Sequence, residues 1–201
     1  MFYYSLRLSN YIRHTLTKDA TSIWIAQREG RSKDGDDRTA TGLLKMFAMS
    51  SDNIEDGLQA LSIIPMAVSY EYDPCDMMKT NELMHLKLLG SYEKKSGEDF
   101  LSMLKGITGH KGRVNISMGN SLNEEHIEHM RSIQNKNEKY RYLTHAIDNE
   151  MHRIFHLWPT NYIAYDLLNG TNDILNNFLT QQIVAYGYLR GLVTLFKKTH
   201  I

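Results

Sequence analysis

The sequence has little cysteine, no net charge and no long hydrophobic run. Cys75 is its one cysteine among 201 residues, which excludes an internal disulfide framework and a cysteine-rich zinc site. Lysine and arginine together number 23, and so do aspartate and glutamate, so the chain lacks the basic balance of a typical nucleic-acid-binding domain. The uncharged stretch 174–189 is interrupted by two Asn and two Gln, so no segment is apolar enough to span a bilayer.

The N-terminal residues also lack the features of a signal peptide. They have neither a basic start nor a small-residue cleavage site, and we therefore expect a cytoplasmic protein. Hydrophobic residues make up 42% of the chain and only 3 residues are proline, a composition typical of folded proteins. The length suffices for one sizeable domain that needs no disulfide or metal for stability.

The spacing of apolar residues predicts both strands and helices. Short apolar or alternating runs predict strands at 23–26, 62–72 and 112–119, with Pro65 indicating an edge, a bulge or the first turn of the second strand. Helical spacing predicts helices over 2–17, near 43–48, and over 80–89, 98–107, 123–134, 140–157 and 171–197. Strands separated by helices are typical of an α/β fold with a parallel or mixed sheet and crossover helices. We expect residues 1–120 to contain this sheet and residues 121–201 to form a helical C-terminal subdomain.

A charged stretch follows the first predicted strand. Ligands in open α/β sheets bind beyond the carboxyl ends of the strands. Arginine side chains there offer paired donors to a phosphate, and glycine lets the backbone approach an anion closely. The stretch 28–31, Arg-Glu-Gly-Arg, is therefore a candidate phosphate-binding loop. The alternative is an ordinary solvated loop without a ligand.

Histidine pairs at helical spacing suggest a metal site only weakly. His126 and His129 are separated by three positions, and His152 and His156 by four. This spacing permits zinc ligation, but no H-E-x-x-H motif is formed and no third ligand is evident. We interpret these residues as ordinary histidines on amphipathic helices, so no metal site is predicted.

Two stretches of the sequence resemble conserved blocks of the glycerolipid acyltransferases. Residues 23–31, Ile-Trp-Ile-Ala-Gln-Arg-Glu-Gly-Arg, are similar to the third block, in which a strand runs into F-P-E-G-T-R. Residues 64–70, Ile-Pro-Met-Ala-Val-Ser-Tyr, are similar to the fourth, a later V-P-V strand. The stretches 70–76, 109–113 and 158–162 resemble a bacterial subgroup of the same enzymes, so the resemblance covers nearly the whole chain.

The resemblance implies an enzyme of phospholipid biosynthesis. Such an enzyme transfers a fatty acyl group from a thioester, acyl-CoA or acyl carrier protein, to glycerol-3-phosphate or 1-acylglycerol-3-phosphate, and uses no other cofactor. It also implies that residues 1–120 are the C-terminal part of the acyltransferase α/β domain, with peripheral contact to the cytoplasmic face of the membrane. The residues implied in binding the substrate phosphate are Arg28, Glu29, Gly30 and Arg31. Those implied in lining the substrate pocket are Ile64 and Pro65.

The sequence departs from the family pattern at its most important motif. Arg28 stands where the family has Pro, and Arg31 where it has Thr. The catalytic N-H-x-x-x-x-D block is expected many tens of residues before the Glu-Gly pair, but only 28 residues precede Glu29. His14 and Asp19 have the spacing H-x-x-x-x-D, yet His14 lies only 15 residues before Glu29, too few for the intervening strand and block. We therefore expect a truncated acyltransferase without its catalytic base, with His14 and Asp19 as weak candidates.

A second interpretation is a non-catalytic binding or interaction module derived from this family. The missing base favours it, and so does the broad apolar face predicted for residues 171–197. Removal of a neighbouring strand would also expose a sheet edge, and self-association would offset part of that loss.

Overall fold

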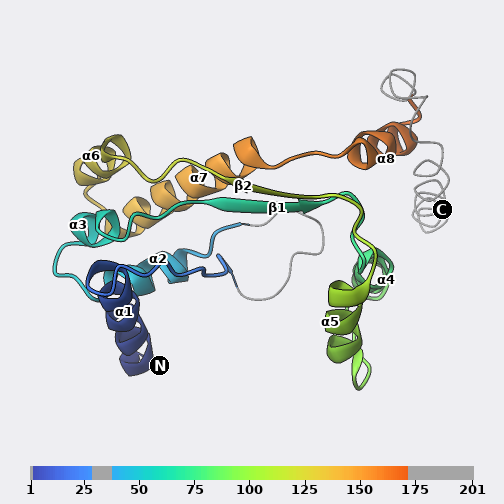
Figure 1. The fold of residues 1–201 in the computed structure, drawn as a ribbon, viewed down its shortest axis with the longest axis horizontal. Helices are drawn as coiled ribbons and strands as arrows, with labels where there is room; N and C mark the ends of the chain where they lie inside the picture. Colours follow the sequence, from blue (N-terminus) through green and yellow to red (C-terminus); the bar gives the residue numbers. More distant parts are fainter. Residues whose placement is uncertain (1, 29–37, 172–201) are drawn as a thin grey trace. The chain divides into compact units, whose positions relative to one another are not determined.

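The structure, a computed structural model, describes residues 2–28 and 38–171 (Figure 1). Within this part, most residues with regular secondary structure are helical and one sheet is formed. The elements in chain order are α1 (Phe2–Thr17), α2 (Thr41–Ala48), α3 (Ile54–Gln59), β1 (Met66–Tyr70), α4 (Asp76–Leu89), α5 (Glu98–Thr108), β2 (Val114–Met118), α6 (Glu124–Ser132), α7 (Lys136–Ile154) and α8 (Pro159–Asn169).

Most of the predicted helices are confirmed. Helix α1 has the predicted bounds, and α2, α4, α5, α6 and α7 occur where helical spacing placed them. The sequence interpretation missed α3 and α8. Helix α3 has only six residues and α8 begins at Pro159, a residue favoured at the first position of a helix but easily interpreted as a loop signal. Of the helix predicted over 171–197, only Thr171 is among the described residues.

Contacts divide the chain into two compact units. The first unit contains Met1–Ala67 and Ser117–Phe155, and the second contains Val68–Ile116 and His156–Ile201. This grouping does not coincide with a boundary at residue 120, because α6 and α7 pack with α2 and α3. Whether residues 1–120 are the C-terminal part of an acyltransferase domain stays a prediction.

The first unit is a helical assembly around one apolar core. The largest side chains that are fully buried in it are Leu44, Leu58, Ile127, Met130 and Leu143. They come from α2, α3, α6 and α7, so segments far apart in sequence share the same core. Burial of a side chain of this size stabilises the folded state by about 1.5–3 kcal/mol relative to leaving it exposed.

Asparagine side chains cap the N-termini of three of these helices. The side-chain oxygen of Asn53 accepts a hydrogen bond from the Asp56 amide at the start of α3. Asn123 does the same for α6 and Asn135 for α7. These acceptors pair amide donors that have no partner inside the helix, and each such cap typically contributes ~1 kcal/mol.

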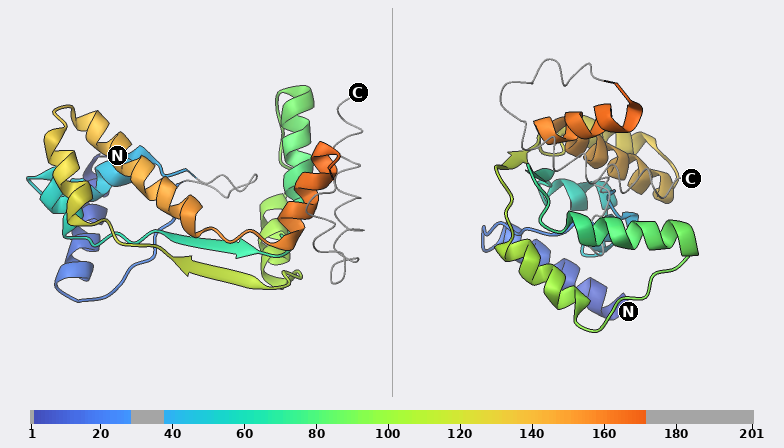
Figure 2. Two further views of the ribbon diagram at one scale, coloured as in Figure 1. Left: turned by 90° about the horizontal axis from the view of Figure 1, so that it is seen from above. Right: turned by 90° about the vertical axis from the view of Figure 1, so that its right-hand side faces the viewer.

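Strands β1 and β2 form the sheet of the described chain, and they are antiparallel (Figure 2). The Glu71 amide donates to the Arg113 carbonyl at 2.9 Å, and the Gly119 amide donates to the Pro65 carbonyl at 2.8 Å. The residue numbers of the two hydrogen-bonded pairs have the same sum, because in an antiparallel pair one strand advances along the sequence as the other goes back. Both strands therefore lie where predicted, but the expected parallel pairing is not found. The segment that contains α4 and α5 connects the end of β1 to the start of β2. Because both lie at the same end of the strand pair, the two strands run in opposite directions.

The run 23–26, predicted as the first strand, is irregular in the structure. Ile23 and Ile25 pack against the core of the first unit, whereas Trp24 is 73% exposed. The side chains thus alternate as in a half-buried strand, but among the described residues the sheet contains only β1 and β2. A strand needs a neighbour to pair its backbone amides and carbonyls, and the prediction from side-chain pattern alone could not supply one.

Among its described residues, the second unit contains the helices α4, α5 and α8. Helix α5 packs through small residues: the Cys75 thiol donates to the Ser102 carbonyl at 3.3 Å, and a Cβ on Gly106 would lie 3.7 Å from Cys75 Sγ. Trp158 is the N-cap residue of α8, and its amide donates to the Asn161 side chain at 2.7 Å. The described interior of this unit thus combines the apolar side chains of Trp158 and Ile163 with small or polar groups.

A carboxylate of α7 forms a hydrogen bond with the backbone just after β2. Glu150 accepts a hydrogen bond from the Asn120 amide at 2.6 Å and two from the guanidinium of Arg153. The Arg153 side-chain hydrogen bonds, followed by the Asn120 amide, lower the pKa of Glu150 to about 2. A carboxylate with a lowered pKa stabilises the fold above its unfolded pKa, near 4.5, and this contribution is lost as pH falls through the folded value.

We expect Glu150→Gln to weaken the dependence of stability on pH between about 4.5 and 2. Urea unfolding followed by circular dichroism at several pH values measures this. The wild-type midpoint should fall more steeply with acidification than that of the variant. Glu128→Gln is the control, because Glu128 pairs with Arg131 at the exposed surface. Equal slopes for wild type and Glu150→Gln would contradict the prediction.

Candidate functional site

The predicted phosphate-binding loop starts in the first unit directly after the run 23–26. Of its four residues, Arg28 is described, and Glu29, Gly30 and Arg31 lie outside the described residues. The loop is closed at its base, because the Ala40 amide donates to the Gln27 carbonyl at 2.9 Å. Gln27 and Ala40, which lie on either side of the segment 28–39, are therefore next to each other in the first unit.

A buried carboxylate of α7 holds the returning end of this loop. The amide and the hydroxyl of Thr39 both donate to Asp148 Oδ1, at 2.8 and 2.6 Å. Both residues are buried, and 109 positions separate them in sequence. Sequence reasoning missed Asp148, since an aspartate inside an amphipathic helix carries no signal of a partner this remote.

Helix α2 begins immediately after this anchor. Its N-cap residue, Ala40, makes no side-chain cap, and its first turn contains no acidic residue. A Cβ on Gly42 would have nothing within 4 Å, so the space beside the first turn is open. The amides at the start of a helix carry partial positive charge and favour anions nearby. The loop thus returns to an end of α2 that suits a negative ligand.

The structure brings His14 and Asp19 together at the end of α1. His14 Nδ1 and Asp19 Oδ2 are 3.3 Å apart, and both side chains are more than half exposed. The proximity has a local cause, because the Lys18 and Asp19 amides both bond to the His14 carbonyl and turn the chain back. An aspartate at this position can orient an imidazole, but the contact alone assigns no catalytic role.

Ile64 and Pro65, the residues implied in the substrate pocket, lie just before β1. Pro65 is buried and Ile64 is 49% exposed. Pro65 has no amide hydrogen, so it fits the position directly before a strand, and its carbonyl pairs with Gly119. Their role in a pocket stays a prediction.

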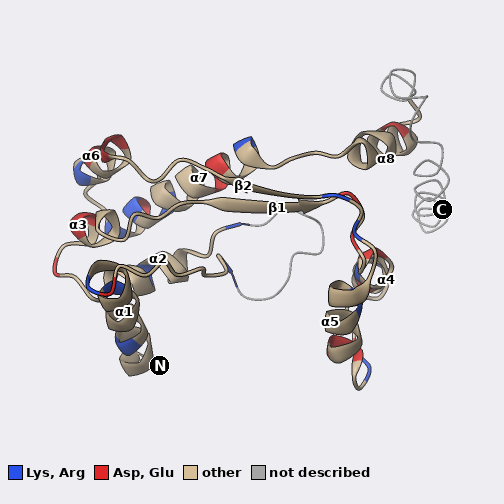
Figure 3. Cartoon of the chain, in the orientation of Figure 1, with Lys and Arg blue, Asp and Glu red and all other residues tan. Residues whose placement is uncertain are grey.

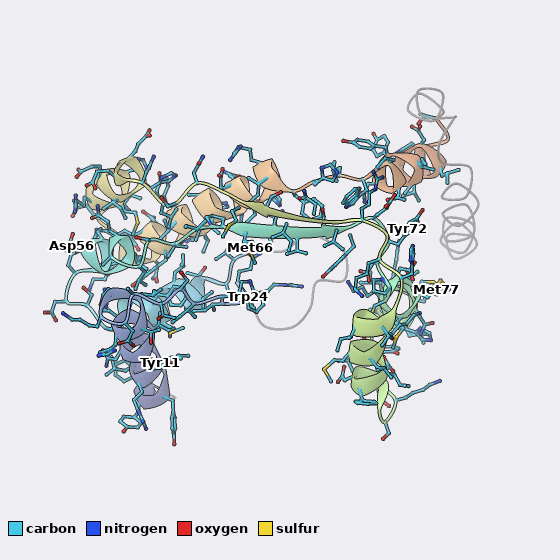
Figure 4. The ribbon with its side chains drawn as sticks, viewed as in Figure 1. Tyr11, Trp24, Asp56, Met66, Tyr72 and Met77 are labelled. Atoms are coloured by element: carbon cyan, nitrogen blue, oxygen red, sulfur yellow. The ribbon has the colours of Figure 1, made fainter. Side chains whose placement is uncertain are left out.

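The three stretches that resemble the bacterial subgroup meet in the second unit. Arg113 Nε and Nη2 each donate to a carboxylate oxygen of Glu71 at 3.0 Å, and the Arg113 amide donates to Glu71 as well. The guanidinium of Arg113 also lies 4.9 Å from the centre of the Trp158 ring, and the Thr160 hydroxyl donates to the Glu71 carbonyl at 2.9 Å. Figure 4 shows the neighbouring Tyr72 where β1 leads into the turn before α4. The cluster joins the start of α8 to the end of the strand pair.

Electrostatics and sterics both favour this arrangement. The Arg113 hydrogen bonds lower the pKa of Glu71, and the same bonds raise the pKa of Arg113. Gly112 has a φ of +61°, and a Cβ there would lie 2.8 Å from Glu71 Oε2 and 2.9 Å from Tyr72 Cδ2. A larger residue at 112 would therefore strain the backbone and collide with the carboxylate. We interpret the cluster as stabilising the fold and not as a ligand site, because its charged groups are already paired with each other.

The histidine pairs have other neighbours in the structure. His126 Nδ1 is 2.5 Å from the side-chain oxygen of Asn123. His129 contacts Tyr142 with ring centres 4.3 Å apart and tilted rings, and His156 contacts Trp158. In residues 2–28 and 38–171, no group of three or more His, Cys, Asp or Glu side chains is placed to hold a metal ion.

Charges and apolar helices give little further indication of a ligand. Figure 3 shows lysines and arginines interspersed with aspartates and glutamates along the helices. No helix among the described residues combines the length and the hydropathy needed to cross a bilayer. Comparison of the chain with protein-family models, curated proteins and solved structures returns no match.

Proposed function

We propose that this chain is the substrate-phosphate part of an O-acyltransferase of phospholipid biosynthesis. Arg28, Glu29, Gly30 and Arg31 bind the phosphate of glycerol-3-phosphate or 1-acylglycerol-3-phosphate. The observation that supports this most is the closed base of the loop, where Gln27 bonds Ala40 and Thr39 bonds Asp148. A loop fixed at both ends presents its arginines with less loss of conformational entropy on binding. Helix α2 begins beside it and adds the partial positive charge of its first turn.

The reaction needs a base in addition to a phosphate site. A glycerol hydroxyl loses its proton to the base, and its oxygen attacks the thioester carbonyl of acyl-CoA or acyl carrier protein. The new ester C–O bond forms, the C–S bond breaks, and the thiolate leaves and takes up a proton. A positioned base typically contributes ~100- to 10,000-fold to such a rate. A chain that holds only the phosphate would therefore bind substrate but transfer acyl groups slowly.

The base of the complete enzyme is proposed to lie outside this chain, with His14 and Asp19 as the remaining candidates inside it. The exposure of both side chains argues against a catalytic role, because a base at an acyl transfer site works in a cleft that excludes water. Their 3.3 Å contact is the one feature in favour.

We further propose that the run 23–26 is a strand of the parallel or mixed sheet of the complete acyltransferase. Ile23 and Ile25 pack on the core while Trp24 is exposed, which is the alternation of a half-buried strand. A ligand loop directly after a strand is the usual arrangement in α/β enzymes. Peripheral contact with the membrane, where the lipid substrate resides, belongs to the same proposal.

Titration with glycerol-3-phosphate tests the phosphate site. We expect wild-type protein to bind it, and Arg28→Ala or Arg31→Ala to weaken binding roughly 10- to 100-fold, because each removes a charge-assisted hydrogen bond. Isothermal titration calorimetry at low ionic strength measures the affinity. Arg7→Ala is the matched control, because it removes the same charge from an exposed position on α1. Equal affinities for all four proteins would refute the assignment.

Acyl transfer from a labelled thioester to 1-acylglycerol-3-phosphate tests the location of the base. We expect no transfer above background from the chain of residues 1–201, with or without His14→Ala. Transfer that disappears in His14→Ala would instead make His14 and Asp19 the catalytic pair. The same preparations serve in the glycerol-3-phosphate titration, so an inactive protein is distinguished from a misfolded one.

A second candidate function, a non-catalytic interaction module, is favoured by α5. Its side chains Phe100, Leu101 and Ile107 are 64%, 58% and 77% exposed, whereas its buried side faces Cys75 through Ser102 and Gly106. The large apolar residues thus lie opposite the packed side. Contiguous apolar surface of this kind commonly marks an interaction site. We take self-association as the interaction, because a second copy is always available to cover the face.

We expect the double variant Phe100→Ser, Ile107→Ser to shift a concentration-dependent dimer towards monomer. Multi-angle light scattering coupled to gel filtration measures the mass over a range of concentrations. Leu168→Ser, which changes an apolar residue of α8 that is 52% exposed, is the control. A monomer at all concentrations would exclude self-association, and co-sedimentation with lipid vesicles would then assign the face to a membrane.

A further inference from the structure

Helix α1 has an exposed aromatic face, formed by Tyr3, Tyr4, Leu8 and Tyr11. The three tyrosines are 63%, 73% and 64% exposed, and Leu8 is 48% exposed. Tyr4, Leu8 and Tyr11 are separated by four and three positions, so their side chains follow one another along the same side of the helix. The rings of Tyr3 and Tyr4 contact each other edge to face, with centres 5.6 Å apart. The aromatic face is thus a continuous surface and not a set of isolated side chains.

A different face of α1 packs on the first unit. Ser9 and Ile12 are buried there. The Ser9 hydroxyl donates to the Phe47 carbonyl at 3.1 Å, and Arg13 Nη2 donates to the Gly57 carbonyl at 2.9 Å. These contacts fix the rotation of the helix about its own axis. The aromatic face is therefore held in place by the first unit without being the face that this unit buries.

The charge of α1 complements an anionic surface. The whole chain has equal numbers of basic and acidic residues, but α1 contains Arg7, Arg13 and no acidic residue. The guanidinium of Arg7 is exposed and lies 5.8 Å from the centre of the Tyr3 ring, beside the aromatic face. Helix α5, whose apolar side chains are also exposed, instead begins with Glu98 and Asp99, which an anionic surface repels. Of these two helices, α1 has the charge that suits anionic lipids.

The residue types of the aromatic face favour a membrane over a second protein surface. Tyrosine has an apolar ring and a polar hydroxyl, so at the level of the lipid headgroups the ring enters the apolar layer while the hydroxyl stays in water. In a dry protein interface, each of the three hydroxyls would need a hydrogen-bond partner. An arginine beside the rings adds attraction to lipid phosphates.

We infer that the aromatic face of α1 binds the surface of a membrane that contains anionic lipids. The tyrosine rings and Leu8 enter the boundary between headgroups and acyl chains, and Arg7 pairs with headgroup phosphates. The inference gives the peripheral membrane contact of the proposed function a specific surface. It rests on that function for its purpose, the supply of a lipid acceptor, whereas the contact itself does not depend on the phosphate site.

Co-sedimentation of the 201-residue chain with lipid vesicles tests the inference. We expect binding to vesicles of phosphatidylcholine mixed with phosphatidylglycerol, and weaker binding to phosphatidylcholine alone. The double variant Tyr4→Ser, Leu8→Ser should weaken binding roughly 10- to 100-fold, because two apolar side chains no longer enter the lipid. Arg7→Gln should weaken binding about 5-fold on the anionic vesicles only, the usual effect of one basic residue near such a surface.

The double variant Tyr165→Ser, Leu168→Ser is the matched control. It removes the same two residue types from α8, where they are 61% and 52% exposed. We expect it to bind vesicles as the wild type does. Circular dichroism of each variant shows that a loss of binding is not a loss of folding.

The outcomes are distinct. No binding of the wild type to the anionic vesicles would overturn the inference, and so would equal weakening by the α1 and α8 double variants. Equal binding to both kinds of vesicle would overturn the requirement for anionic lipids. Titration with glycerol-3-phosphate decides the phosphate site separately: vesicle binding without glycerol-3-phosphate binding refutes that site and supports the contact through α1.

Discussion

The arrangement of the first unit depends on α7, which combines apolar burial with hydrogen bonds to remote segments of the chain. One side of this helix contributes Leu143 and Ile147 to the apolar core, to which α1, α2, α3 and α6 also contribute. Its carboxylates also accept hydrogen bonds from segments that are remote in sequence: Asp148 from the Thr39 amide, and Glu150 from the Asn120 amide. Apolar burial brings the helices together without specifying direction, whereas these hydrogen bonds specify which backbone atoms meet. Both kinds of interaction are needed to place Thr39 and Asn120 against α7.

The local structure could be predicted from sequence because it depends on local patterns. The spacing of apolar residues in α1 and the alternation in β2 each determine an element within a few neighbouring residues. The direction of strand pairing could not be predicted in this way. It depends on where the connection between β1 and β2 returns, and the contact of Glu71 with Arg113 shows that it returns to the end it left.

The candidate site shows the same division. The residue types at 28–31 suggested a phosphate, since arginine and glycine have chemistry that can be named from the sequence. Asp148 could not be found in the same way, because the meaning of a helical aspartate depends on a partner 109 positions away. His14 and Asp19 represent the opposite case. Their spacing looked accidental, and the turn at the end of α1 brings them to 3.3 Å for purely local reasons.

The two candidate functions make opposite demands on the chain. A phosphate site needs a fixed loop, and in the first unit a buried carboxylate holds Thr39, which follows the proposed loop. An interaction module needs uncovered apolar surface, and the second unit supplies it on α5, where Phe100 and Ile107 lie on the exposed side. These features belong to different units and do not compete for the same residues. The proposed anion site and the proposed contact surface on α5 therefore use different residues, and an acyltransferase of the proposed kind that takes its acceptor from a membrane would need both.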